Sequence, residues 1–337
     1  MADGSGDWVV ADSLTEARVA AGKVQGRRTT ASHRWPLEVP DGDWDATLRT
    51  TWVDAAYLEA DASWCEPGGE PASVLANGGA FGAKRDGGPG WVESDESVDE
   101  SLDVGDTGNV GQALDVRAVA RRLADRHRRP VLALASREDV AALSPKRPPV
   151  AGGMRADGSG LLRVVATPGI AEAVASVAPG LEVEQVPVPG PPTSVGLRAA
   201  GWAEAVVLTA GATGRLGTVR SPDGADAEAV IEDGTINVVV GCGRVLDATV
   251  LRSYCIGAAH MAWSWLTSEA MLVDADGTVH DLTVRSFGVL RAVDTPPIEV
   301  EIIAGDRDPV NGSDAVFAAV AAAGWLANDC AQDWPIG

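Results

Sequence analysis

The sequence predicts an α+β protein in which helices pack on mixed sheets. Stripes of apolar residues at helical spacing alternate with short apolar runs of strand length after residue 115. Glycine- and proline-containing turn sequences separate these segments. The length of 337 residues and an apolar fraction of 45% are enough to bury a core in a protein of two domains or one large one.

Net charge excludes two classes of partner. The chain has 27 basic and 48 acidic residues, giving a net charge of −21. Binding to nucleic acid or to an anionic membrane requires a basic face, so we expect neither partner. The longest nearly apolar run, residues 315–327, is shorter than the roughly 20 residues that span a bilayer, and the N-terminus lacks signal-peptide features. We therefore expect a cytoplasmic protein.

The first third of the chain contains few regular elements. Residues 1–47 are polar, and residues 48–58 have the pattern of a strand. Residues 85–111 form an acidic interruption. Its acidic residues are Glu93, Asp95, Glu96, Asp99, Glu100, Asp103 and Asp106. Such a block is typical of a solvated surface loop, which we expect here, and a binding surface for a basic partner is the alternative.

Clear periodicity begins at residue 116. Apolar residues at i, i+3, i+4, i+7 and i+8 predict an amphipathic helix. These residues are Val116, Val119, Ala120, Leu123 and Ala124. Residues 131–135 and 161–166 predict strands. The proline-rich run 187–192 can continue neither a helix nor a central strand, so we expect an extended connector at a domain boundary.

The second half alternates in the same way. We expect a helix over 197–208 and two strands, 229–231 and 236–240, joined by a hairpin turn at 232–235. The next helix has one apolar face, which consists of Val250, Tyr254, Ala258, Met261 and Trp265. Residues 274–277 resemble part of a calcium loop, but the other ligand positions are absent, so we expect a turn between two strands. A final helix presents Val316, Ala319, Val320 and Ala323 on one side.

These elements predict a three-part organisation. Residues 1–47 form an N-terminal extension, and residues 48–190 form a first domain that includes the acidic loop 85–111. Residues 191–337 form a second domain.

Two short motifs carry functional candidates. In Gly78-Gly-Ala-Phe-Gly82, followed by Lys84, glycines permit close backbone approach to a ligand, although such loops are also ordinary turns. Gly312-Ser-Asp314 precedes the final helix, where it serves as a helix cap or as an anion site. The four histidines and four cysteines have no metal-ligand spacing, so we expect no protein-ligated metal and no disulfide framework.

Taken in order, these segments resemble the molybdenum-cofactor-binding large subunit of the xanthine dehydrogenase and aldehyde oxidase family. Gly78-Gly-Ala-Phe-Gly-Ala-Lys84 resembles the family's GGGFGGK loop, and Tyr57-Leu-Glu59 with Ala62 resembles its LEP strand. Further likenesses begin at Pro130, at Lys146-Arg-Pro148, at Val239-Val-Gly-Cys-Gly-Arg-Val-Leu246, at Asp294-Thr-Pro-Pro297 and at Val310. The resemblance touches most of residues 45–328.

The resemblance implies the fold of the molybdopterin-binding domains and a function. The family binds molybdenum through a pyranopterin and hydroxylates an aldehyde or N-heterocycle with water. Electrons pass to iron–sulfur and FAD centres, which we expect on partner subunits, together with a second large subunit. Gly79, Ala80, Phe81 and Gly82 are the implied cofactor contacts, with Gly312 at the last motif.

Several positions depart from the family. Its catalytic glutamate, the general base, corresponds to Ser313, with Asp314 next to it. A serine is no base near neutral pH without an activating partner, and a shifted aspartate has a shorter reach. We find no arginine equivalent to the family's Arg-Gly-Phe-Gly near the proline-rich run, and the central cofactor-binding stretch is missing. Residues 1–47 are at most a remnant of the leading domain.

Three functions follow from these observations. The chain is a compact hydroxylase subunit with Asp314 and Ser313 at its catalytic position, or a cofactor-free structural or assembly subunit of such a complex. The third is an unrelated small-molecule-binding α+β protein. We favour the molybdopterin-binding oxidoreductase subunit, with its catalytic activity left open.

Overall fold

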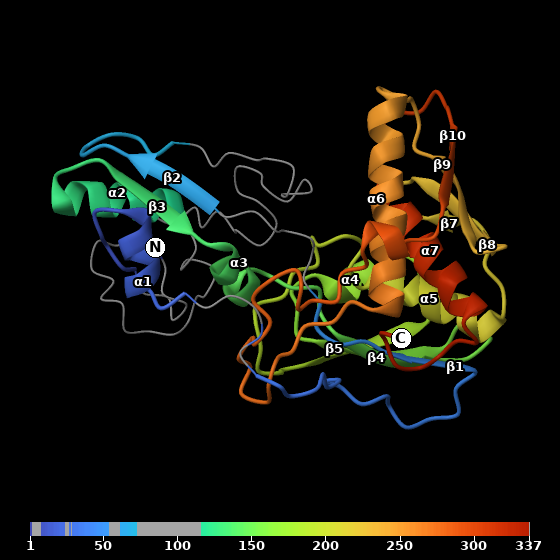
Figure 1. Ribbon diagram of the computed structural model, residues 1–337. Helices are drawn as coiled ribbons and strands as arrows, with labels where there is room; N and C mark the ends of the chain where they lie inside the picture. Colours follow the sequence, from blue (N-terminus) through green and yellow to red (C-terminus); the bar gives the residue numbers. More distant parts are fainter. Residues whose placement is uncertain (2–7, 24–26, 28, 54–60, 73–115, 337) are drawn as a thin grey trace.

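The computed structural model describes residues 1, 8–23, 27, 29–53, 61–72 and 116–336. In this part of the chain, helices pack against three sheets (Figure 1), which confirms the predicted mixed architecture. The Gly78–Gly82 loop and the acidic segment 85–111 lie outside the described residues. No helix in the described ranges is both long and apolar enough to cross a membrane.

The first four-stranded sheet has the order β1-β4-β5-β6. Its strands are β1 (Ala46–Arg49), β4 (Val150–Met154), β5 (Gly160–Val165) and β6 (Leu181–Val186). The first three are antiparallel neighbours, and β6 runs parallel to β5 after the crossover helix α4 (Ile170–Ala175). In β4, a Cβ at Gly153 would lie 2.3 Å from the ring of Trp44, so this glycine lets the indole lie directly on the strand.

The second four-stranded sheet has the order β10-β9-β8-β7. Its strands are β7 (Val219–Arg220), β8 (Asp226–Glu232), β9 (Thr235–Gly241) and β10 (Ile298–Ile303). A tight turn joins β8 to β9, with Asp233 at φ 48° and Gly234 at φ 74°. Positive φ at both central residues is characteristic of a type I′ hairpin, so the predicted turn is confirmed. Strand β10 returns parallel to β9.

A smaller layer, separate from the two four-stranded sheets, contains the two-stranded sheet β2-β3 and three helices from the first half of the chain. Its elements are β2 (Asp61–Cys65), β3 (Val131–Ala135), α1 (Leu14–Ala20), α2 (Val116–His127) and α3 (Arg137–Leu143). The apolar stripe that predicted α2 is the buried face of the helix, and it packs with Cys65, Ala133 and Ala135 in a separate hydrophobic cluster.

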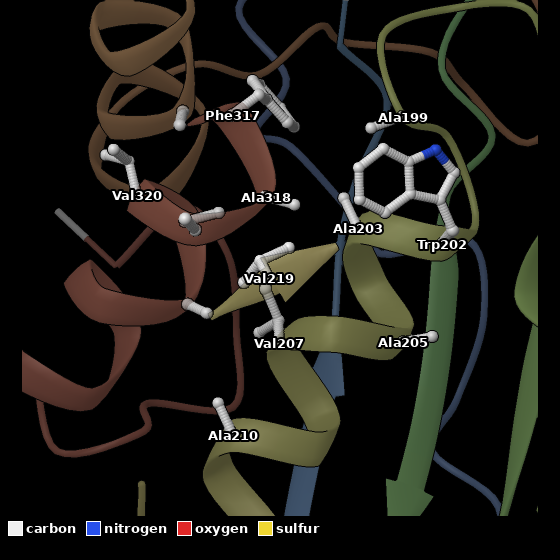
Figure 2. Packing of buried hydrophobic residues seen from close by; sticks show 14 of the residues in the cluster. Ala199, Trp202, Ala203, Ala205, Val207, Ala210, Val219, Phe317, Ala318 and Val320 are labelled. Carbon is white, nitrogen blue, oxygen red and sulfur yellow. The ribbon is translucent and has the colours of Figure 1, made fainter. Parts of the chain in front are cut away.

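Helix α7 (Ser313–Ala327) occupies the centre of the main core. It packs between α5 (Trp202–Thr213) and α6 (Ala248–Thr267) and against β8 of the second sheet. Nearly every α7 residue from Ala315 to Trp325 is small or apolar and buried, which allows close approach on all sides. Figure 2 shows Ala203 of α5 on the side of that helix that faces Ala318 of α7. The main cluster joins side chains from both four-stranded sheets.

Several predicted elements differ in extent. The helix expected over 197–208 is α5, and it begins at Trp202 because Ala199 and Gly201 both have positive φ. The apolar face predicted on α6 is only partly covered: Trp265 is buried, whereas Val250 and Tyr254 are 50% and 52% exposed. The turn at Asp274–Gly277 is present, but an isolated bridge between Val273 and Val279 replaces the expected strands. The three-part division of the chain remains a prediction.

Candidate functional site

A small, partly open cavity of about 20 Å³, which is room for about one water molecule, lies where α6 and α7 meet the segments that carry Val53, Arg147 and Leu197. Its apolar walls consist of Val53, Leu197, Met261, Trp265 and Phe317. The rings of Trp265 and Phe317 stack with centroids 5.4 Å apart and planes 17° apart. Pockets with mainly apolar walls and a few polar groups are typical ligand sites. The polar groups of this cavity are Arg147, Arg198 and Glu269.

Arg147 is fully engaged by protein groups. Its guanidinium makes two parallel hydrogen bonds to Glu204 of α5, both 2.8 Å long. It also lies over the rings of Trp265 and Phe317, at 4.2 and 4.9 Å from their centroids. This combination of a bidentate ion pair and aromatic stacking exploits the flat shape of the guanidinium. Arg147 therefore joins the first sheet to α5, α6 and α7.

The same guanidinium fixes the turn before α5. Arg147 donates to the carbonyl oxygens of Arg198 and Ala199, and Glu204 accepts a bond from the backbone N–H of Gly201 at 2.9 Å. Ala199 has φ 58°, a conformation that costs energy for a residue with a side chain. Contacts from two buried charges thus hold the turn that carries Arg198.

Arg198 differs from Arg147 in its hydrogen bonding. Within the described part of the chain, its Nη1 atom is buried and has no hydrogen-bond partner. Burial lowers the pKa of this guanidinium, while the nearby carboxyl of Asp314 acts in the opposite direction. A buried donor of this kind is unusual in a folded protein, and a water, an ion or a ligand group would satisfy it.

Asp314 lies in the first turn of α7, on the same helix face as Phe317 of the cavity wall. Burial raises the pKa of its carboxyl, although Arg198, Arg147 and hydrogen bonds from Asn311 and Ser313 oppose this shift. A carboxyl with a raised pKa is a stronger proton acceptor than an ordinary aspartate. The Asp314 carboxyl and the Arg198 guanidinium therefore influence each other electrostatically near the cavity.

Ser313 and Gly312 are held by contacts within the chain. The Ser313 N–H and hydroxyl donate to Oδ1 of Asn311 at 3.0 and 2.8 Å, so the Asn311 side chain satisfies one backbone N–H at the start of α7, where Gly312 is the N-cap residue. The same hydroxyl lies 3.4 Å from Oδ1 of Asp314. A Cβ at Gly312 would lie 3.0 Å from Val240 and 3.2 Å from Cys242. Packing against β9 thus accounts for this glycine, and a cofactor contact there stays a prediction.

The structure brings together only some of the residues that the sequence singled out. Asp314 lies near Arg198 and one helical turn before Phe317 of the cavity wall, and Ser313 directly precedes it. Gly79, Ala80, Phe81 and Gly82 lie outside the described residues. Among the described residues, no group of three or more histidine, cysteine, aspartate or glutamate side chains could hold a metal ion.

Sequence reasoning missed the roles of three residues. Arg147 appeared only as part of a basic segment, and Glu204 had no role. From the sequence we found no site arginine near the proline-rich run. Arg198 follows that run, however, and it lines the cavity. The signal that could have located it is Arg198-Ala-Ala-Gly201, a charged residue inside an apolar segment with a helix-starting glycine. The hydrogen-bond partners of Arg147 are 51 to 57 residues away, too distant for a local pattern.

Comparison with solved structures provides a fold relationship. Quinoline 2-oxidoreductase from Pseudomonas putida 86 matches with a TM-score of 0.57 and 9% identity, over 86% of this chain and 74% of that one. The chain shares the fold of this oxidoreductase. A carbon monoxide dehydrogenase from Oligotropha carboxidovorans matches at 12% identity over 53% of this chain and 34% of that one, with a TM-score of 0.27. No protein-family model matches the sequence, and no curated protein matches it significantly.

Proposed function

We propose that this chain is the molybdopterin-binding subunit of an oxidoreductase complex that hydroxylates an aldehyde or N-heterocycle with water. The observation that carries this proposal is the position of Asp314 in the first turn of α7, near Arg198 and one helical turn before Phe317 of the aromatic cavity wall. The order of sequence motifs and the fold shared with quinoline 2-oxidoreductase support it. Partners with iron–sulfur and FAD centres, and a second large subunit, belong to the same proposal.

One described residue offers a contact to the implied cofactor. The unpartnered Nη1 of Arg198 suits an anionic, oxygen-rich group, and further contacts would come from Gly79, Ala80, Phe81 and Gly82. When bound, a molybdenum–pyranopterin would supply water-derived oxygen and accept two electrons from the substrate. In this proposal the Asp314 carboxylate takes up the proton released from water, and the Ser313 hydroxyl helps to orient that carboxylate.

Metal content and turnover test the proposal separately. The intact complex should contain molybdenum and show hydroxylase activity that growth on tungstate removes. Asp314→Asn should retain molybdenum but lose about 10²- to 10⁴-fold in turnover, the range for a general base. Phe81→Ala should reduce cofactor retention or turnover. Asp226→Asn, in an exposed pair with Arg220, is the matched control and should leave both unchanged. An intact complex without molybdenum would overturn the proposal.

A cofactor-free structural subunit is the second candidate. The observation that favours it is the filling of the space at Gly312 by Val240 and Cys242 of the same chain. This alternative predicts stoichiometric co-purification with a longer catalytic large subunit and no molybdenum bound to this chain.

A further inference from the structure

The solvent face of α2 is strongly basic, although the net charge of the chain is −21. Residues 117–129, in α2 and the turn after it, contain six arginines and one acid, Asp125. All six arginines are exposed, and together they form the arginine face: Arg117, Arg121, Arg122, Arg126, Arg128 and Arg129. Helix α2 lies far from α5, α6 and α7 (Figure 1), so the candidate site does not account for this face.

Two of these arginines have acidic partners at the surface. Arg121 pairs with Glu70, and Arg129 pairs with Asp12 at 3.0 Å. The two carboxylates are 88% and 81% exposed, so solvent screens both pairs and each contributes little to stability. Most of the charge of the arginine face therefore remains available to a further partner.

The spacing of the arginines makes the remaining charge unfavourable. Arg122 and Arg126 are one helical turn apart, where two side chains of like charge repel each other. Within the described part of the chain, neither has an acidic partner, and Arg128 in the turn after the helix has none. A carboxylate-rich segment bound here would relieve this repulsion, because a guanidinium forms two parallel hydrogen bonds with one carboxylate.

The chain itself contains such a segment shortly before α2. Residues 93–106 contain seven acids and no basic residue, and binding to a basic surface is one of the two roles expected for them. Nine residues separate Asp106 from Val116, where α2 begins. These nine residues can span up to roughly 30 Å, whereas a helix of 12 residues is about 18 Å long. The segment can therefore reach the whole arginine face.

We propose that the acidic segment 93–106 binds the arginine face of α2 in the same chain. Covalent linkage over a short connection provides an effective concentration on the order of millimolar, so several weak ion pairs are sufficient. The occupant is this segment and not a nucleic acid or an anionic membrane, because the net charge of −21 repels a second polyanion. The contact weakens as ionic strength rises, because salt screens exposed charges.

Cleavage by a glutamate-specific protease measures this contact in the full-length protein. The segment contains three cleavage sites, Glu93, Glu96 and Glu100. A free peptide of residues 90–108 gives the cleavage rate of the unbound segment in the same buffer. Relative to this peptide, the protein should be cleaved in the segment at least about fivefold more slowly at about 50 mM salt, and the difference should shrink at about 500 mM.

Substitutions on α2 test the basic side of the contact. Arg122→Glu combined with Arg126→Glu should bring cleavage of the segment at low salt close to the rate of the free peptide. Circular dichroism checks that this variant retains its helices. Arg215→Glu combined with Arg285→Glu, at exposed arginines outside α2, is the matched control and should keep the protection.

Substitutions in the segment test the acidic side without any change to α2. Asp95→Asn, Asp99→Asn and Asp103→Asn together retain the three glutamate cleavage sites and should remove most of the protection. This variant keeps the proposal falsifiable if the α2 variant fails to fold.

Cleavage at the rate of the free peptide at low salt would overturn the proposal, as would full protection in the triple aspartate variant. Protection should also be independent of protein concentration. Protection that increases with concentration would mean that the segment binds a second copy, and protection lost on nuclease treatment would mean that a nucleic acid mediates it. Either result would contradict binding within one chain.

Discussion

Arg147 and Glu204 form an ion pair that is almost completely removed from water, with side chains 6% and 0% exposed. Loss of one partner from such a pair leaves the other charge buried without compensation. Glu204→Gln should therefore lower the free energy of unfolding by about 3–5 kcal/mol, measured by urea denaturation.

A pair on the surface of the first sheet provides the control for this substitution. Arg163 and Glu184 have the same 2.8 Å distance but are 32% and 47% exposed. Glu184→Gln should cost about 0–1 kcal/mol, because solvent screens that pair. Similar losses for the two variants would show that burial of the Arg147–Glu204 pair has no energetic consequence.

Asp314 should make stability depend on pH in a defined direction. Burial raises the pKa of its carboxyl in the folded state, so the native protein binds more protons than the unfolded chain between the ordinary aspartate pKa and the raised value. The stability that this group contributes is complete below the ordinary pKa, about 4, and is lost as pH rises through the raised pKa.

Asp314→Asn removes this titration while keeping a similar shape. Its free energy of unfolding relative to the parent protein should rise with pH above about 4 and then level off, as measured by urea denaturation across a pH series. Asp226 has a pKa lowered by its hydrogen bonds with Arg220, so Asp226→Asn should give the opposite slope, and only below about pH 4. A pH-independent difference for Asp314→Asn would contradict the prediction.

At the scale of helices, alanine substitutions at two glycines with different surroundings distinguish the effect of packing on stability from the effect of helix propensity. In α5, a Cβ at Gly211 would lie 2.4 Å from the ring of the fully buried Trp325 and 3.1 Å from Ala46. In α6, a Cβ at Gly257 would meet nothing within 4 Å. Gly211→Ala should destabilise the protein by about 1–3 kcal/mol through overpacking.

Gly257→Ala should instead stabilise by about 0.5–1 kcal/mol, because alanine restricts the unfolded chain and favours the helix. Thermal and urea unfolding of both variants measure the difference. Stabilisation by both substitutions would mean that the contact between α5 and Trp325 is looser than the structure indicates.

The elements themselves were predictable where one local pattern determines them. The stripe from Val116 to Ala124 predicted α2, and the 232–235 turn predicted the hairpin between β8 and β9. The start of α5 was not predictable, because tertiary contacts of Arg147 and Glu204 hold Ala199 at positive φ inside an apolar, helix-like segment. The apolar face of α6 was recognisable, but periodicity does not specify which part of a face is covered.

At the scale of the whole molecule, the site depends on residues from distant parts of the chain. Asp314 was a candidate from sequence because it begins a recognisable helix. Its environment was not predictable: Arg147 and Arg198 reach it only through the packing of α5, α6 and α7 on the first sheet. The chemistry of the candidate site therefore follows from the assembled core and not from any one motif.

This shared core also predicts how the molecule unfolds. Leu162 of β5 and Ile236 of β9 are both fully buried, and they belong to one hydrophobic cluster although they come from different sheets. Leu162→Ala and Ile236→Ala should each destabilise by about 2–5 kcal/mol and shift the same urea transition. Tryptophan fluorescence reports this transition, because Trp325 and Trp334 lie in the cluster.

The layer that contains α2 has a separate hydrophobic cluster, so we expect it to unfold in a second transition. Leu123→Ala should leave the urea midpoint of the fluorescence transition unchanged and should shift this second transition, which circular dichroism detects. If residues 48–190 and 191–337 instead unfold as independent domains, Leu162→Ala and Ile236→Ala would each move a different transition. The fluorescence experiment thus tests the predicted domain boundary against the continuous core. Arg147 lies on the loop before β4 and Glu204 lies on α5, so their ion pair joins the two predicted domains. A single transition for both sheets would show that these two residues belong to one cooperatively folded unit.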